Sequence, residues 1–517
     1  MINHIFTAET RGRRENKTLV GLAIGYKSAG KRNFPSSLSP FLLFFFLLLG
    51  ASAVNLFAQE MPPAPGEPRS VSVPAVKEQK LANGLTVAVV ERPGVPLVTI
   101  QLLIKAGASA EDNAKAGLAD MTASMLTKGT KTRTATQIAE QIEFLGGSIN
   151  SGAGWNNSFA AVTVTSDKVD QAMDILADVI LNPAFDQKEL DLLKSQNLDG
   201  LKFNLKQPSF LANYVASRYS FGEHPAGGTP ASIESISRTD VSQFHSGNYS
   251  PDAAVLVFAG DITAAAASAA AEKLFGAWKK SPRVGSAVGM GRPMAERDAV
   301  KRLLVIDLPK AGQAAVNYLK PISSIGRGNR SYFPASVLNS VLGGGYSSRL
   351  NLEIRIKRGL SYGAGSTFGW RGAKSNFSTR TQTKNESAAE VAELVLVELR
   401  KLLDANVATD ELVPRKSVLT GGFGRNLETT GGLASAVGDL YAFGLPTSEL
   451  NTYTSNVNTV TATQIKDFAN QNLLGGDIII VGDYAIFKDD LAKRFPNMKI
   501  DVIKADDLDL SKDNLRK

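Results

Sequence analysis

The guanidinium of Arg355 and the phenol of Tyr362 are two side chains whose types and spacing could bind an oxygen acceptor. They stand seven residues apart in EIRIKRGLSYG (353–363). Arginine carries a permanent charge and five donors, and tyrosine adds an adjustable donor. Together they could bind a peptide carbonyl or a developing oxyanion, where one charge-assisted hydrogen bond contributes about 1.5–3 kcal/mol. A structural alternative stays open, in which Arg355 caps a helix and Tyr362 begins a core strand.

Three consecutive glycines, Gly343, Gly344 and Gly345, precede this stretch. Because glycine tolerates unusual backbone angles, the segment permits close approach of a peptide. A loop that simply ends a helix is the alternative. The segment does not predict a phosphate cradle, since no Gly-Lys-Ser or Gly-Lys-Thr follows it.

Side chains for metal or nucleophilic chemistry are few. The chain has no cysteine and three histidines, and after His4 only His224 and His245 remain. Neither has a His or Glu three or four residues away, the spacing that puts two ligands on one helical face. Zinc needs three or four rigidly held ligands, and a serine nucleophile would need a histidine in a catalytic setting, which neither remaining histidine has. We expect this chain to bind no metal, and both histidines to be turn or domain-edge residues.

The elements that must position these residues are amphipathic helices and alternating strands. GLADMTASMLTKGT (117–130) has apolar residues at helical spacing, which predicts a helix with one buried face. The segments 135–147 and 167–181 predict two more helices. SFAAVTVTS (158–166) alternates as a strand does, and 85–107 holds two apolar runs around a Pro-Gly turn that predict paired strands.

The second half of the chain repeats the plan of the first. IESISRTDVSQF (233–244) recurs in pattern 224 residues later as VNTVTATQIKDF (457–468), and an apolar strand ending in Gly-Asp follows each copy. A period this long indicates a duplicated domain rather than a solenoid. We expect an α+β fold of two homologous α/β-sandwich domains of roughly 220 residues each.

Composition sets the expected boundaries. These are a leader at 1–58, a Pro-rich tether at 59–78, an N-terminal domain at 79–278, a Gly/Pro/Ser-rich linker at 279–298, a C-terminal domain at 299–500 and a polar tail at 501–517.

The leader combines basic residues, the apolar run FLLFFFLLLGASAV (41–54) and small residues, the pattern of a cleaved secretory signal. The run is shorter than the ~20 residues of a spanning helix. We expect a periplasmic or secreted protein, with a retained membrane anchor or an organellar presequence as alternatives. Of the formal net charge of +8, the leader holds seven Lys/Arg against two Glu. The remaining charge of +3 is too weak to imply nucleic acid as a partner.

The order of these segments resembles the pitrilysin/insulinase-type metallopeptidases, the inverzincins. The stretches that carry the resemblance span about residues 80–485: NGLTVAVVE, AGLADMTASMLTKGT, GEHP, SQFHSGNYSPDAAVLVFAGD, LGGGYSSRLNLEIRIKRGLSYG and IIIVGD. The resemblance implies two mixed domains that form half of a clamshell. Active members bind zinc through H-x-x-E-H on a helix, where the two histidines are ligands and the glutamate is the general base.

Aligned on the flanking G-L-A and K-G-T triplets, the functional positions of that motif are Asp120, Ala123 and Ser124 in this chain. The third zinc ligand of the family, a glutamate on a later helix, falls near Gly200. All four groups are therefore absent. A complete zinc site contributes ~10–16 kcal/mol, much of which is lost with these ligands.

The resemblance also implies roles in the second half. Arg355 and Tyr362 match the pair that holds substrate from the half opposite the metal, and the glycines at 343–345 resemble the glycine-rich loop of the non-catalytic subunit of mitochondrial processing peptidase.

The function implied is that of an inactive-type subunit of a heterodimeric zinc metallopeptidase. It would form the chamber wall and substrate clamp for a homologous H-x-x-E-H partner, which binds zinc and cleaves a peptide or unfolded polypeptide. Two alternatives are a non-enzymatic peptide-binding or scaffold protein of the same family, and a self-sufficient peptidase with an unrecognised site.

Overall fold

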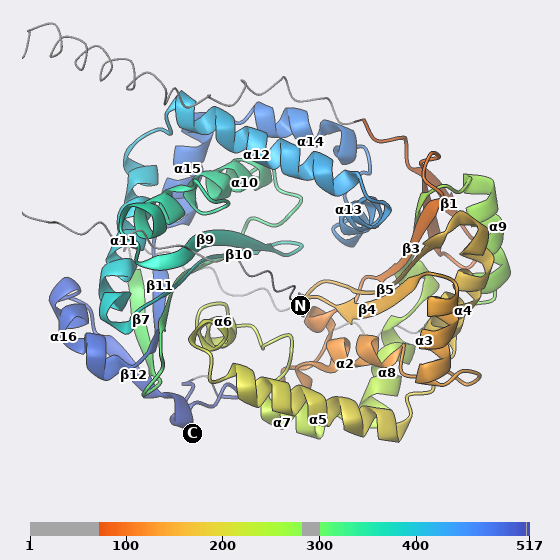
Figure 1. The fold of residues 1–517 in the computed structure, drawn as a ribbon, viewed down its shortest axis with the longest axis horizontal. Coiled ribbons are helices and arrows are strands. Elements are labelled where there is room, and N and C mark those ends of the chain that lie inside the picture. The colour runs from red at the N-terminus through yellow and green to blue at the C-terminus, as the bar shows by residue number, and fades with distance from the viewer. Residues whose placement is uncertain (1–71, 282–299, 513) are drawn as a thin grey trace, which may run out of the picture. The chain divides into compact units, whose positions relative to one another are not determined.

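The computed structural model describes three stretches of the chain, residues 72–281, 300–512 and 514–517 (Figure 1). All of them belong to one compact unit, Pro68–Lys517. The expected leader and most of the tether and linker lie outside the described residues. Within those stretches, no helix combines the length and apolar character needed to cross a bilayer.

The first domain is built on a six-stranded mixed sheet. Its strands, in the order β1-β2-β6-β3-β5-β4, are β1 Lys77–Lys80, β2 Thr86–Glu91, β6 Ala254–Gly260, β3 Leu97–Ile104, β5 Ser158–Thr165 and β4 Ser148–Ala153. Buried and half-buried residues alternate along β5, which confirms the strand predicted at 158–166. Every residue of β6 is buried, as expected for a central strand covered on both faces.

The two strands predicted within 85–107 form as β2 and β3, but the prediction that they pair was wrong. β6 lies between them, parallel to β2 and antiparallel to β3. A fully buried strand needs a hydrogen-bonded neighbour on each edge, because its backbone groups have no water to bind. That requirement places β6 inside the local hairpin.

Helices cover this sheet and lead toward the second domain: α2 Leu118–Met125, α3 Ala135–Phe144, α4 Val169–Leu181, α5 Gln187–Asn204, α6 Pro208–Tyr219, α7 Pro230–Ser235, α8 Arg238–Asn248 and α9 Ala264–Phe275. The helices predicted at 135–147 and 167–181 are confirmed as α3 and α4. A capping box between Thr134 and Gln137 begins α3, because their side chains satisfy two backbone N–H groups reciprocally.

The second domain repeats this order and confirms the duplication. Its strands, in the order β12-β7-β11-β8-β10-β9, are β12 Ile500–Lys504, β7 Val300–Asp307, β11 Gly476–Gly482, β8 Ala314–Ile322, β10 Ser375–Thr383 and β9 Ser361–Trp370. Its helices are α10 Tyr332–Leu342, the π-helical η6 Asn351–Lys357, α11 Ala388–Asp404, α12 Thr409–Leu427, α13 Thr430–Ala442, α14 Glu449–Asn458, α15 Ala462–Asn472 and α16 Tyr484–Arg494.

Two expected boundaries differ from the structure. The polar tail expected at 501–517 begins inside β12, which pairs in parallel with β7, so the second domain extends past residue 500. The tether expected to end at 78 is already ordered at Val73, whose backbone exchanges two hydrogen bonds of 2.9 and 3.0 Å with the amide of Asn451. Both segments are polar in sequence and gain their order from pairing with distant residues.

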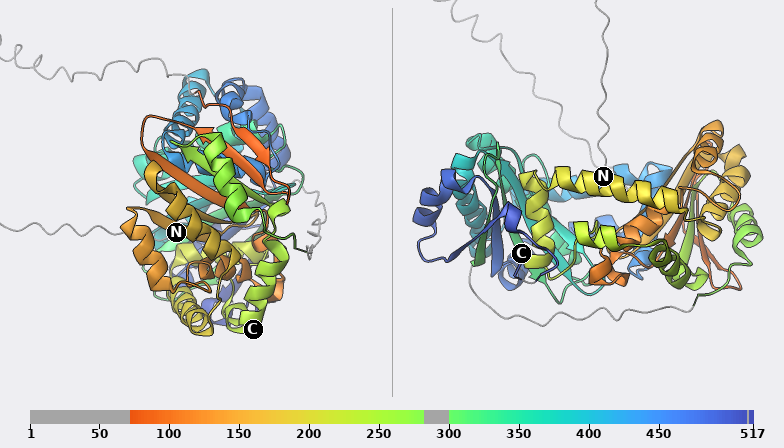
Figure 2. Two further views of the ribbon diagram at one scale, coloured as in Figure 1. Left: turned by 90° about the vertical axis from the view of Figure 1, so that its right-hand side faces the viewer. Right: turned by 90° about the horizontal axis from the view of Figure 1, so that it is seen from below.

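Each domain covers a face of the other domain's sheet with one helix. α6 of the first domain packs on β8 and β11, and its duplicate α13 packs on β3 and β6 (Figures 1 and 2). The Asn317 amide donates to Asn213 on α6 at 3.1 Å, and the hydroxyls of Thr99 and Thr430 at the start of α13 lie 2.8 Å apart. The hydrophobic core is therefore continuous between the domains.

This exchange predicts that neither domain folds alone. A fragment of residues 72–281 would leave the faces of β3 and β6 without α13 and expose the apolar side of α6, so we expect it to aggregate or bind a hydrophobic dye. Adding the fragment 300–517 should restore a monodisperse complex, measured by gel filtration and circular dichroism. A fragment 72–281 that unfolds cooperatively as a monomer would contradict the exchange.

Candidate functional site

Helix α2 carries the positions of the expected motif and begins on a buried carboxylate. Gly117 adopts a left-handed backbone angle (φ 92°) that turns the chain into the helix. The N–H groups of Gly117 and Ala119 donate to Glu111 at 2.8 and 2.7 Å. These N–H groups lack partners within the helix, and a carboxylate there also favours the helix dipole. Met121 and Met125 are buried on the packing face of α2.

The three motif positions on α2 differ in burial and offer no complete catalytic set. Asp120 is half-buried; burial raises its pKa, and the backbone N–H of Ala153 at the end of β4 offsets part of the rise. Ala123 is completely buried, and Ser124 is half-buried. An alanine side chain can neither ligate a metal nor accept a proton, so the arrangement offers no general base at that position.

The fourth position is equally unsuited to zinc. Gly200 lies on α5 with open space where a side chain would extend. Among the described residues, no group of three or more His, Cys, Asp or Glu side chains is arranged to hold a metal ion. The zinc that the resemblance implies for active members therefore does not fit this donor set.

Beside α2, the edge strand β4 presents free backbone groups. The hydrogen bond from Gly154 N–H to the Asn157 carbonyl closes the β4–β5 hairpin. Because the bonding direction alternates along a strand, the backbone N–H and C=O groups of the even-numbered residues of β4 face β5. The odd residues Ile149 and Ser151 point outward, and no described residue bonds their backbone groups. Both are half-buried. An open edge of this kind can accept an extended peptide as an added strand.

The edge strand β9 of the second domain is partly engaged within its own domain. Ser366 N–H donates to the Gly343 carbonyl at 3.1 Å, and Ala364 N–H donates to Asn351 Oδ1 at 3.3 Å. The duplicated sheets thus differ at equivalent edges. Two outward N–H groups of β9 are therefore engaged within the domain, whereas no described residue bonds those of Ile149 and Ser151 on β4.

His224 is committed to a buried network. Its Nε2 lies 2.9 Å from Glu111 and its Nδ1 lies 2.8 Å from the Asn113 side-chain oxygen. Its ring packs against Trp155 with 5.1 Å between ring centroids. Burial raises the pKa of Glu111, and the donors at His224, Ala119 and Gly117 offset part of this effect. With both ring nitrogens engaged, His224 is unavailable as a metal ligand or base.

The neighbouring Glu223 joins the first domain to the β9–β10 turn of the second. This buried carboxylate accepts from Arg371 at 3.0 Å, Lys374 at 2.9 Å and Asn376 at 3.1 Å. Burial opposes ionisation, but Arg371 and Lys374 prevail and lower the pKa of Glu223. Arg371 also lies over the Trp155 ring at 4.8 Å, the stacking geometry of a cation–π contact.

His245 lies within helix α8, not in the turn or at the domain edge expected from the sequence. Its Nε2 lies 2.9 Å from the Ile180 carbonyl, and burial lowers its pKa to about 4. The ring is therefore neutral at physiological pH and joins α8 to the end of α4.

Arg355 is half-buried and Tyr362 is exposed, and no contact between them is found among the described residues. Arg355 lies on η6 and stacks over the exposed ring of Tyr346, 5.0 Å from its centroid. Tyr362 is 90 % exposed on β9, so the alternative that it begins a core strand is wrong. π-Helical segments such as η6 are rare and are found frequently at functional sites.

The three glycines before η6 differ in how much space surrounds them. A Cβ on Gly343 would lie 2.2 Å from the backbone nitrogen of Ser366, so glycine is required there for contact with β9. Gly344 is similarly close to Ser340 at 2.8 Å, whereas Gly345 has open space around it. The structural role dominates at the first two positions.

Sequence reasoning missed Glu111, Glu223 and the β4 edge. Glu111 sits in the polar segment SAEDNAK, which has the pattern of a solvated loop, and SINSGA has too few apolar residues to show the alternation of a strand. The GEHP segment was noticed through its resemblance to the family, but its contacts depend on a turn 148 residues away.

Asp120 predicts a pH-dependent difference in stability. Its pKa is raised in the folded state, so the stability it contributes is present below its ordinary value of 3.8 and is lost as pH rises through the folded pKa. Asp120→Asn keeps an acceptor for Ala153, and its unfolding free energy relative to wild type should grow as pH rises toward 7. Asp120→Ala leaves the Ala153 N–H unpaired and should cost about 1–3 kcal/mol.

Urea unfolding at several pH values measures both effects, with Asp170→Asn on exposed surface as the matched control. An Asp120→Asn difference that does not vary with pH would contradict the buried ionisation.

Comparisons with known proteins match the chain to one peptidase family. The model for insulinase (peptidase family M16) matches residues 86–215, and that for the peptidase M16 inactive domain matches 235–417. An uncharacterized zinc protease of Bacillus subtilis is 25 % identical over 69 % of this chain and 85 % of its own length. Another from Rickettsia bellii is 29 % identical over 56 % of this chain and 68 % of its own length.

Solved structures show the same fold. A peptidase M16 inactive domain from Pseudomonas fluorescens superposes with a TM-score of 0.71 at 26 % identity, over 79 % of this chain and 98 % of the other. A protease from Helicobacter pylori gives a TM-score of 0.72 at 18 % identity, over 80 % of this chain and all of the other. The two family models together cover more than half of the sequence, and this chain belongs to the insulinase-type M16 peptidase family.

Proposed function

We propose that this chain is the non-catalytic subunit of a two-chain M16 peptidase that works in the periplasm. It holds extended segments of a peptide or unfolded polypeptide, and a homologous subunit with an intact H-x-x-E-H helix binds zinc and cleaves them. Metal and general base then belong to the partner, and this chain contributes only binding and orientation.

The main support for this proposal is that α2 is present as a packed helix but lacks the zinc ligands and general base of the H-x-x-E-H motif. The helix keeps its buried packing face, yet Asp120 is engaged by Ala153 and Ala123 has no reactive group. A fold that lacks its catalytic groups is expected to persist when the neighbouring surface still binds a ligand or partner. The inactive-domain match and the similarity to proteins called zinc proteases support a role beside an active relative.

The open edge of β4 supports peptide binding in particular. Main-chain hydrogen bonds to Ile149 and Ser151 would hold any extended sequence, because backbone groups are common to all peptides. On the second domain, Tyr362 is exposed and Arg355 is half-buried, so both keep surface that can contact a peptide.

Metal analysis and hydrolysis of the separate and combined chains test the division of labour. We expect the purified, tag-free chain to contain no stoichiometric zinc and to leave a fluorescence-quenched peptide intact. The complex co-purified from the native host should contain zinc and cleave that peptide in a chelator-sensitive way. Stoichiometric zinc with chelator-sensitive hydrolysis in the isolated chain would overturn the proposal, and an inactive complex would favour the non-enzymatic scaffold.

A proline at the outward position of β4 tests the peptide-binding edge. Ser151→Pro removes one outward N–H and leaves the ladder with β5 intact, which edge strands tolerate. We expect binding of a neutral extended peptide to weaken roughly fivefold, as one net hydrogen bond of about 1 kcal/mol is lost. Ser151→Ala retains the N–H and is the matched control. Equal affinity of the two variants in fluorescence anisotropy would exclude the edge.

A further inference from the structure

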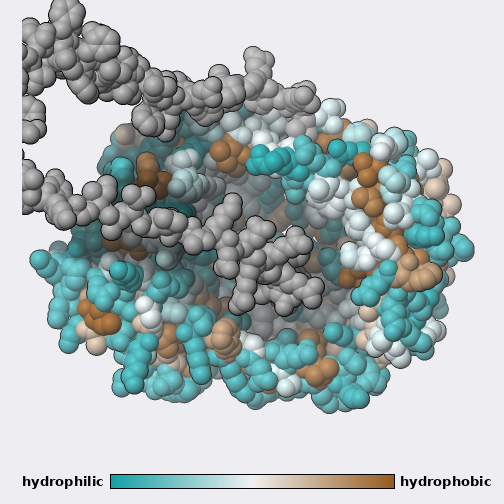
Figure 3. All heavy atoms as spheres, in the orientation of Figure 1, coloured by the Kyte–Doolittle hydropathy of each residue, from teal (hydrophilic) through white to brown (hydrophobic). Residues whose placement is uncertain are grey.

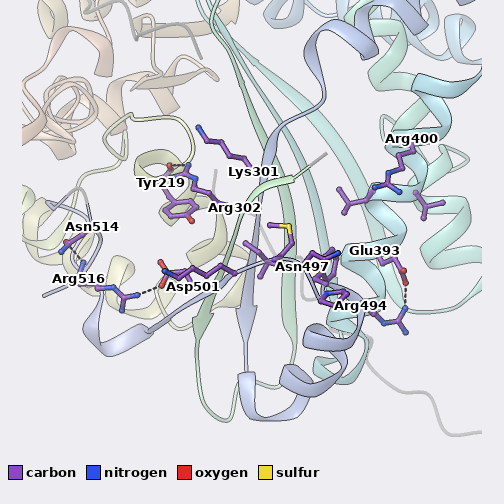
Figure 4. A pocket seen from close by; sticks show the side chains of 17 residues that line it. Tyr219, Lys301, Arg302, Glu393, Arg400, Arg494, Asn497, Asp501, Asn514 and Arg516 are labelled. Atoms are coloured by element: carbon purple, nitrogen blue, oxygen red, sulfur yellow. Dashed lines mark hydrogen bonds and ion pairs between the residues drawn. The ribbon is translucent and has the colours of Figure 1, made fainter. Parts of the chain in front are cut away.

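A concave site lies in the second domain, away from α2 and β4. It is a pocket of about 1080 Å³ formed where the start of β7, the middle of α11, the end of α16 and the start of β12 meet (Figure 4). Ligand pockets in proteins commonly have volumes of about 300–1,000 Å³. This one therefore has room for a short stretch of polypeptide and exceeds the needs of a single small ion.

The lining of this pocket is strongly basic. Only Glu393 and Asp501 are acidic, against six basic side chains: Lys301, Arg302, Arg400, Arg494, Lys499 and Arg516. Figure 4 shows Lys301 and Arg302 on one side of the strand ends and Arg400 with Arg494 on the other. A concave surface with one sign of charge concentrates its potential and attracts the opposite sign.

Three of the arginines already have carboxylate partners. Arg302 makes two hydrogen bonds to Asp477, at 2.9 and 2.5 Å; Arg494 pairs with Glu393; and Arg516 pairs with Asp501 at 2.5 Å. These pairs are fixed parts of the wall.

Two cations of the lining remain available. Arg400 on α11 and Lys499 before β12 are both exposed, and neither forms an ion pair with any described residue. They supply the unbalanced charge of the pocket, because the other arginines are held by carboxylates.

Apolar side chains lie among these charges. Leu396, Val397, Phe495 and Met498 also line the pocket, and Val397 is 39 % exposed although it is large and hydrophobic. A phosphate ion cannot make apolar contacts with such a surface. A peptide with alternating acidic and apolar residues could contact both the basic and the apolar side chains. Elsewhere, on the face seen in Figure 3, hydrophobic residues form small separate patches among hydrophilic ones.

We propose that this pocket binds acidic segments of the polypeptide, and so gives the chain a preference for acidic substrates. The inference rests on the proposed function, because it assumes that the chain binds polypeptides. It adds a second point of attachment, chosen by charge, to the sequence-independent edge at β4. Arg400 and Lys499 are the residues that recognise the acidic side chains.

Fluorescence anisotropy with the isolated full chain tests the pocket. The probes are a labelled peptide of sequence Asp-Asp-Leu-Asp-Asp-Phe and its matched form with Asn in place of Asp. We expect the double variant Arg400→Ala/Lys499→Ala to weaken binding of the acidic peptide about tenfold, since each exposed charge pair contributes modestly. Binding of the Asn peptide should not change, and added salt should weaken the acidic peptide selectively.

The control is Arg330→Ala/Lys384→Ala, which removes the same net charge from two exposed positions outside the pocket. Equal weakening by both double variants would mean that only the overall charge matters, and would overturn the pocket. Binding of inorganic tripolyphosphate or of phosphatidylserine vesicles that depends on Arg400 and Lys499, without binding of the acidic peptide, would overturn it as well.

The two proposals can fail separately. If the complex with the partner cleaves peptides and Ser151→Pro weakens binding, but the acidic peptide is not preferred, only the pocket assignment is wrong. If neither peptide binds the isolated chain and the complex is inactive, the proposed function is wrong. An acidic preference that persists in Ser151→Pro and disappears in Arg400→Ala/Lys499→Ala supports the pocket as a site distinct from the edge.

Discussion

The need to cover both faces of two apolar sheets governs this structure. The central strands β6 and β11 are buried along their whole length, so water must be excluded from both sides of each sheet. Helices of the same domain pack on one face, as α4 does on β5 and α9 on β2. The other face is covered by a helix from the duplicated domain, α13 or α6. The two domains are therefore one cooperative unit, and the polar contacts between them are held by a shared core.

That shared core explains how the reactive positions could change without loss of the fold. Most residues of α2 are buried, and only Asp120 and Ser124 are half-buried, so the helix keeps its packing whether or not these positions carry reactive groups. Asp120 then serves as an acceptor for Ala153, and Glu111 satisfies the start of the helix from within the core. The same Glu111 meets His224, whose neighbour Glu223 binds three donors from the second domain. The site helix is thus connected to the contact between domains through adjacent residues.

Local periodicity was sufficient to predict α3, α4 and β5, because each buries one face and its sequence shows it. The repeat of 233–244 at 457–468 was sufficient to predict the duplication. The pairing of β2 and β3 was predicted wrongly because β6, which separates them, lies more than 150 residues later. The exchange of α6 and α13 left no signal, since an apolar helix face does not specify which sheet it covers. The polar segments around Glu111 and β4 acquire their roles only through distant partners.

The bond between Asp120 and the Ala153 N–H has a consequence for any strand added to β4. It engages the last outward N–H of that edge, so the N–H groups left for a guest chain are those of Ile149 and Ser151. Such a short ladder fixes the register of the guest relative to α2 but gives it a brief residence time. In the proposed peptide-binding role, a fixed alignment with rapid release would allow many segments of one long polypeptide to be sampled in turn.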